Sequence, residues 1–125
     1  MQCMLRRSGE KIATHVTVAD TFFARLRGLM FCKELSAGTG LLLVPCPQIH
    51  TCFMRFPIDA VFCDKTGKVL FVQENMKPWR WGRFVRGGHY TLELPGGSLG
   101  GRVRAGDEII FADHFNQLAA GEKIQ

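Results

Sequence analysis

Apolar and polar residues alternate along the first part of the chain. Between Lys11 and Ala19, apolar side chains fall at Ile12, Val16 and Val18, with Thr14 keeping the same period. A period of two is typical of a strand that buries one face. We therefore predict a strand over residues 11–19.

The spacing then changes to that of a helix. Four apolar residues recur on one helix face: Phe22, Phe23, Leu26 and Leu29. Asp20 offers a side-chain oxygen to the first free backbone N–H groups, and Gly28 suits an early C-terminal stop. We predict a short helix from about Thr21 to Arg27.

Short apolar runs bounded by Gly, Pro or Asp continue to the end of the domain. They predict strands at residues 41–44, 49–53, 58–63, 68–73, 90–94 and 107–111. Asp64 to Gly67 has the composition of a hairpin turn. Gly96 to Gly101 lacks the lysine of a phosphate-binding loop, and we interpret it as a tight turn. Residues 114–125 are expected to form a frayed helix or a disordered tail.

This element order predicts a single α+β domain that is mainly antiparallel β. We expect one domain over residues 1–125, with a core at about 10–111 and a tail at 112–125. The sheet is predicted to be barrel-like, with one or two short helices. The 14 Gly and 5 Pro, the 46% apolar share and the 22% charged share agree with a turn-rich globular protein.

Cysteine usage and hydropathy bear on the compartment. The five cysteines are odd in number, and residues 1–9 contain no apolar signal segment. We therefore expect a reducing, cytoplasmic setting. The longest apolar runs fall far short of the roughly 20 residues that a membrane span requires, so no span is predicted.

Charge is concentrated in one region. Between residues 77 and 104 there are six basic residues and one acidic residue, Glu93, whereas the rest of the chain has ten of each sign. The whole net charge of +5 thus belongs to this region. A localised basic surface indicates an anionic partner, either a small molecule, a nucleic acid or an acidic protein surface.

The segment from Lys77 to Tyr90 combines this charge with aromatic residues. Arginine pairs with phosphate or carboxylate, and indole rings stack on bases or cations. The candidate ligand-binding residues are Trp79, Arg80, Trp81, Arg83, Arg86, Arg102 and Arg104. The alternative is that one tryptophan plugs the end of the sheet while the arginines extend over it into solvent.

Two acidic residues lie within apolar strands. Asp59 stands between Ile58 and Ala60, and Glu93 between Leu92 and Leu94. Buried carboxyl groups of this kind serve either as acids and bases with raised pKa values or as acceptors that hold loops. We favour the structural role for Asp59. If Asp59 and Glu93 converged within about 5–10 Å, they would resemble a hydrolase pair.

His50, Cys52, Cys46 and Cys63 form a weaker candidate, for a zinc or copper ion. Their spacing matches no zinc module, and isolated cysteines usually act as small buried apolar residues. We expect no metal site and no cofactor.

The ordered motifs carry a family resemblance. They are Thr21–Met30 (TFFARLRGLM), Gly40-Leu-Leu-Leu, His50–Phe62 (HTCFMRFPIDAVF), Leu92-Glu-Leu-Pro-x-Gly and Gly106-Asp107. The chain resembles the family called domain of unknown function 192 over about residues 10–111. The resemblance implies a mixed α/β or β-barrel-like domain and implies no activity.

Two functions remain as hypotheses. The first, which we favour, is a binding or accessory module that docks an anionic partner through the loop at residues 77–90 with Arg102 and Arg104. The second is a small hydrolase-like enzyme that uses Asp59 and Glu93 beside a pocket floored by Phe53 and Trp79.

Overall fold

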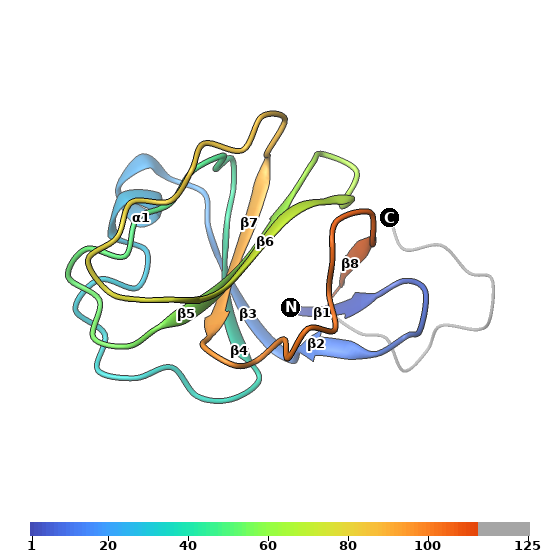
Figure 1. Cartoon of the computed structure of the whole chain (residues 1–125), viewed down its shortest axis with the longest axis horizontal. Helices are drawn as coiled ribbons and strands as arrows, with labels where there is room; N and C mark the ends of the chain where they lie inside the picture. Colours follow the sequence, from blue (N-terminus) through green and yellow to red (C-terminus); the bar gives the residue numbers. More distant parts are fainter. Residues whose placement is uncertain (113–125) are drawn as a thin grey trace.

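The computed structural model describes residues 1–112 (Figure 1). Within them the chain forms one short helix and a series of strands: β1 Gln2–Leu5, β2 Lys11–Ala13, β3 His15–Ala19, α1 Phe22–Arg27, β4 Thr39–Leu43, β5 Ile58–Cys63, β6 Val69–Met76, β7 Tyr90–Pro95 and β8 Ile109–Ala112. The predicted tail at 114–125 lies outside the described residues. None of the described helical residues forms a segment long and apolar enough to cross a membrane.

The strands form two sheets, of five and three strands. The larger has the order β3-β4-β7-β5-β6, and the smaller has the order β2-β1-β8. Strand pairs are antiparallel except for β3 with β4, which run parallel. The α+β, mainly antiparallel prediction is therefore confirmed. The barrel-like detail is not confirmed, because the described strands divide into two sheets and do not close into a barrel.

Two apolar clusters hold the fold together. The first fills the space between the two sheets, where Leu5 and Ile109 of the small sheet meet Val61 and Leu92 of the large one. The second covers the opposite face of the large sheet, where Phe62 packs with residues from loops, including Leu29, Met54 and Val85. In Figure 1 the small sheet and α1 lie at opposite ends of the molecule. The second cluster, which contains Leu29, Met54 and Val85, packs the loops near α1 against the large sheet.

Several predicted elements appear with shifted boundaries. The strand predicted at 11–19 divides at Thr14 into β2 and β3, which join different sheets. The helix is found as predicted, but its N-cap is Thr21, whose hydroxyl accepts a hydrogen bond from the Ala24 backbone N–H at 3.1 Å. Asp20 is thus not the cap.

The strand predicted at 49–53 is wrong. Only an isolated bridge between His50 and Trp81 remains there, because the backbone of this segment bonds to the loop at 77–90 and not to a neighbouring strand. The predicted hairpin is present. The backbone N–H of Gly67 donates to the Asp64 carbonyl at 3.1 Å, and Gly67 has the positive φ of 92° that a side chain would oppose.

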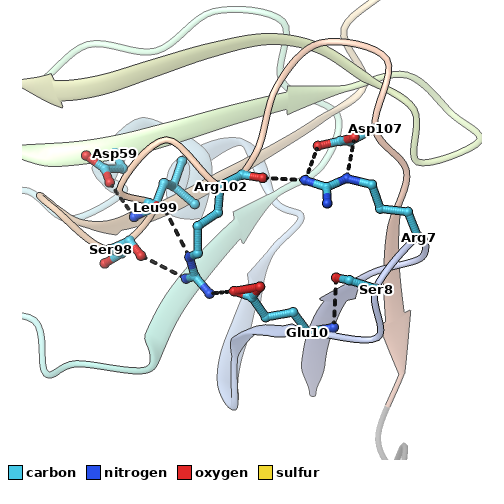
Figure 2. Close-up of polar contacts among 8 residues, drawn as sticks. All are labelled: Arg7, Ser8, Glu10, Asp59, Ser98, Leu99, Arg102 and Asp107. Atoms are coloured by element: carbon cyan, nitrogen blue, oxygen red, sulfur yellow. Dashed lines mark hydrogen bonds and ion pairs between the residues drawn. The ribbon is translucent and has the colours of Figure 1, made fainter.

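Asp59 joins the large sheet to the turn at 96–101. Its carboxylate oxygens accept hydrogen bonds from three backbone N–H groups, those of Asn75 at 2.8 Å, Gly97 at 3.2 Å and Leu99 at 2.9 Å. Figure 2 shows the contact with Leu99. A fully buried carboxylate with three such donors is satisfied by the backbone alone.

Candidate functional site

The loop at residues 77–90 is fastened to the segment at 47–51 by Thr51, whose side chain is fully buried. The Thr51 hydroxyl donates to the Lys77 carbonyl at 2.6 Å and accepts from the Arg80 backbone N–H at 2.9 Å. Three backbone bonds extend the seam: Trp79 N–H to Thr51 O, Gly82 N–H to Ile49 O, and Val85 N–H to Pro47 O. The loop therefore has a defined backbone path.

The aromatic side chains of this loop point outward. Trp79 is 58% exposed, Trp81 75% and Phe84 62%. The interpretation in which one tryptophan plugs the end of the sheet is therefore wrong, because both tryptophans are more than half exposed.

Three exposed aromatic residues form a continuous row. Phe53 packs on Trp79 with ring centres 4.6 Å apart, and Phe31 packs on Phe53 at 5.3 Å. All three have left-handed backbone conformations, with φ of 65° at Phe31, 63° at Phe53 and 64° at Trp79. For bulky residues this conformation is strained by about 1–3 kcal/mol each. The strained backbone conformations thus occur at the three residues whose aromatic rings are exposed.

Three arginines lie in the same loop as Trp79: Arg80, Arg83 and Arg86. Within residues 1–112, no acidic side chain forms an ion pair with Arg80, Arg83 or Arg86. Arg83 lies over the ring of Phe71, 4.5 Å from its centre, and Trp81 packs on His50 at 5.2 Å. We name as the basic aromatic surface Phe31, Phe53, Trp79, Arg80, Trp81, Arg83, Phe84 and Arg86.

Arg102 and Arg104 lie elsewhere. The Arg102 guanidinium pairs with Glu10 and donates to the Ser98 and Leu99 carbonyls, next to the small sheet (Figure 2). The Arg104 backbone N–H donates to Asp107, which also pairs with Arg7. The structure brings Arg80, Arg83 and Arg86 into one loop and does not bring these two arginines to it.

Asp59 and Glu93 do not meet either. In the register of β5 and β7, Glu93 lies opposite Ala60, while Asp59 lies opposite Leu94. Because neighbouring residues of a strand point to opposite faces, the two carboxyl groups point away from each other across the sheet. The convergence on which the hydrolase hypothesis depended is absent.

Glu93 is nevertheless unusual. It is 1% exposed, and within the described chain its Oε1 has no hydrogen-bond partner. Burial raises the pKa of Glu93 to about 8. The carboxyl group is therefore mostly protonated at neutral pH.

The four residues considered for a metal have other contacts. The Cys46 thiol donates to the Gln48 carbonyl at 3.1 Å, and His50 Nδ1 accepts from the Cys52 backbone N–H at 3.1 Å. Cys63 lies in the cluster between the sheets, where burial raises its pKa to about 12. Residues 1–112 contain no group of three or more His, Cys, Asp or Glu side chains placed to hold a metal ion.

Sequence reasoning missed Phe31 as part of the surface. It paired Phe53 with Trp79, but as the floor of an enzyme pocket and not as an exposed row. A positive φ at phenylalanine has no signature in a single sequence, because it is imposed by the surrounding contacts.

Comparisons with known proteins agree with this fold. A UPF0127 protein of Thermococcus sibiricus is 31% identical over 112 residues, which cover 85% of this chain and 72% of the relative. A UPF0127 protein of Pyrococcus horikoshii is 35% identical over 85 residues, covering 66% of this chain and 73% of the relative.

Two solved structures share the fold. One is a protein of unknown function from Novosphingobium aromaticivorans, with a TM-score of 0.76 and 20% identity, covering 89% of this chain and 84% of the other. The second is a Sinorhizobium meliloti protein proposed to be a transcription regulator, with a TM-score of 0.74 and 23% identity, covering 87% and 91%. At these identities the likeness shows the fold alone.

The family model of DUF192, described as an uncharacterized ACR, matches residues 4–111. That match spans the two sheets, the loop at 77–90 and Glu93. The chain therefore belongs to the DUF192 family.

Proposed function

We propose that this domain is a binding module and that its basic aromatic surface binds single-stranded nucleic acid. The observation that carries the proposal is the exposed row of Phe31, Phe53 and Trp79, which is held in strained backbone conformations. The same loop adds Arg80, Arg83 and Arg86, which form no ion pair within residues 1–112. Exposed aromatic rings cost solvation free energy unless a partner covers them. The three rings stay exposed although their backbone conformations are strained, which supports a role of these rings in binding a partner.

Charge supports an anionic partner. Residues 77–90 contain four basic residues and no acidic residue. Arg6, Arg7 and Arg102, near the small sheet, are by contrast engaged with acidic side chains. Within residues 1–112 the arginines of the loop form no such ion pair, so they are available to phosphate groups.

The combination of rings and cations favours single strands over a purely ionic partner. Bases stack on aromatic faces with about 1–3 kcal/mol each, and arginine neutralises the backbone phosphates between them. An acidic peptide would use the arginines but would leave the tryptophan faces without stacking partners.

Fluorescence anisotropy with a labelled 15-nucleotide oligothymidine tests the proposal. Changing Arg80, Arg83 and Arg86 together to Ala is expected to weaken binding at least tenfold. The slope of log K against log salt should fall in magnitude by about 2, because single strands release about 0.7 counterions per phosphate contact. Trp79→Ala should weaken binding about fivefold or more by removing one stacking face.

The matched control removes the same charge away from the loop, with Arg6, Lys65 and Arg104 changed together to Ala. Binding within twofold of the wild type is expected for it. Equal losses in the two triple variants would show that only net charge matters, and absence of oligothymidine binding at 50 mM salt would overturn the proposal. Tighter binding of polyglutamate than of oligothymidine would overturn it in favour of an acidic protein surface.

A further inference from the structure

A cavity of about 310 Å³ lies between α1 and the central strand β7. This volume is at the lower end of the range for small-molecule sites. Its wall is mainly apolar and includes Phe22, Leu26, Leu43, Pro45, Ile49 and Met54. The cavity is distinct from the row of Phe31, Phe53 and Trp79, none of which lines it.

Glu93 supplies the buried polar group of this cavity. On β7 it lies between Leu41 of β4 and Ala60 of β5, so neither neighbouring strand offers it a polar side chain. Its Oε1 lies 3.4 Å from the point where a side chain on Gly28 would begin. Gly28 also lines the cavity, and its positive φ of 49° at the C-cap of α1 favours glycine, so no side chain stands beside the carboxyl group at this position.

The surroundings of Glu93 restrict the charge of a ligand. The titratable and charged groups that line the same cavity are Arg25 and Arg27 of α1, Cys46 and His50. Arg25 donates to the carbonyls of Asp20 and Val44, and among residues 1–112 no second carboxyl group lines the wall. A cationic ligand would face two guanidinium groups without a carboxylate to balance it.

A protonated carboxyl group donates one hydrogen bond through its O–H and accepts others. A primary amide offers the complementary carbonyl acceptor and N–H donor. A carboxylate offers only acceptors, and an ammonium only donors. Among these three groups only an amide edge pairs with both oxygens of the Glu93 carboxyl group. A carboxylate would leave the carbonyl oxygen of Glu93 without a donor, even though Arg25 and Arg27 attract anions.

We propose that this cavity binds a small uncharged molecule with an apolar body and an amide edge that pairs with the Glu93 carboxyl group. The apolar body takes the place of water against Leu43, Ile49 and Met54. The cavity shares no lining residue with the basic aromatic surface, although His50 of its wall packs on Trp81.

Three probes that share one ring test the head group: benzamide, benzoate and benzylamine. Titration of each into the ¹⁵N-labelled protein at pH 6.5 should move the amide signals of Gly28 and Leu43. Benzamide is expected to bind with a millimolar Kd, as its size allows, and at least fivefold more tightly than the two charged probes.

Variants locate the binding. Glu93→Leu should weaken benzamide at least fivefold and abolish the preference among the probes, and Leu26→Trp should block all three by filling the mouth. The variant with Arg80, Arg83 and Arg86 changed to Ala should bind benzamide as the wild type does, which separates this site from nucleic-acid binding.

A pH series on the wild-type protein tests the role of Glu93 even if the Glu93→Leu variant does not fold. Benzamide binding to the wild type should weaken at least threefold between pH 6.5 and pH 9, as the carboxyl group loses its proton, whereas Glu93→Gln should bind equally at both pH values. Three outcomes would overturn the proposal. The three probes could bind equally, or the variant with Arg80, Arg83 and Arg86 changed to Ala could lose affinity for benzamide. The third is that the amide signals of Gly28 and Leu43 do not shift up to saturating benzamide.

Discussion

Asp59 illustrates how a single buried residue decides between a chemical and a structural role. Its carboxylate is fully buried, and its oxygens are occupied by the backbone N–H groups of Asn75, Gly97 and Leu99. These donors come from β6 and from the turn after β7, so one side chain fixes two parts of the chain. An oxygen that accepts these bonds has little capacity left for acid or base chemistry.

Asp59→Asn is expected to destabilise the fold by roughly 2–4 kcal/mol, because the amide N–H₂ replaces one acceptor and faces a backbone donor. Urea unfolding followed by tryptophan fluorescence measures this change. Glu74→Gln is the matched control, since the exposed Glu74 accepts from Gly101 in the same turn, and it should cost less than about 1 kcal/mol. A fully stable Asp59→Asn protein would contradict the structural role.

At the scale of elements, the loop at 77–90 has its own fastening. It contains no strand before β7 begins at Tyr90, yet Thr51 and the backbone of 47–51 hold it through several hydrogen bonds. The exposed rings and arginines therefore stand on a backbone that is fixed at several points. Binding through such a loop loses less conformational entropy than binding through a free one.

Thr51→Val keeps the shape of this side chain and removes its hydroxyl. The carbonyl of Lys77 and the N–H of Arg80 then lose their partner, at an expected cost of about 1–3 kcal/mol in stability. Oligothymidine binding should weaken severalfold as the loop loosens, which hydrogen exchange of residues 77–82 would detect. Thr66→Val in the exposed hairpin is the control, and unchanged exchange in the Thr51 variant would refute the fastening role.

For the whole molecule, Glu93 links stability to pH. Its pKa is raised from 4.5 to about 8 by burial. Between these two pH values the folded protein keeps a proton on Glu93 that the unfolded chain releases. The contribution of this proton to the free energy of unfolding is therefore fully present below about pH 4.5 and is lost as pH rises through 8. Burial raises the pKa values of Cys3 and Cys63 to about 12, and Asp64 and Asp107 have lowered pKa values, so these groups act outside that window.

The free energy of unfolding should therefore fall between pH 5 and pH 8, by an amount on the order of 3–4 kcal/mol at about 1.4 kcal/mol per pKa unit. Glu93→Gln carries no titrating proton and should lack this slope. Urea midpoints of the two proteins across the pH range check this directly. Parallel profiles would mean that Glu93 ionises normally in the folded state.

Much of the fold followed from local pattern. Residues 58–63, the hairpin at Asp64 to Gly67 and the short helix after Asp20 were all predicted, because alternation, turn chemistry and helical spacing act over a few residues. β1 was missed, and residues 49–53 were assigned to a strand. The segment at 49–53 bonds to the loop at 77–90, and β1 pairs with β8 at the far end of the described chain as well as with the nearby β2. A local pattern does not specify such distant partners.

The candidate site divides in the same way. The sequence by itself determined that residues 77–90 combine cations with aromatic rings and that Asp59 and Glu93 lie in apolar strands, because these are properties of composition and near neighbours. Only the tertiary structure decided that the tryptophans face outward, that Phe31 and Phe53 join Trp79, that Arg102 is neutralised by Glu10, and that the two carboxyl groups occupy opposite faces. These outcomes depend on strand register and on contacts between distant segments, which are fixed only when the whole chain packs.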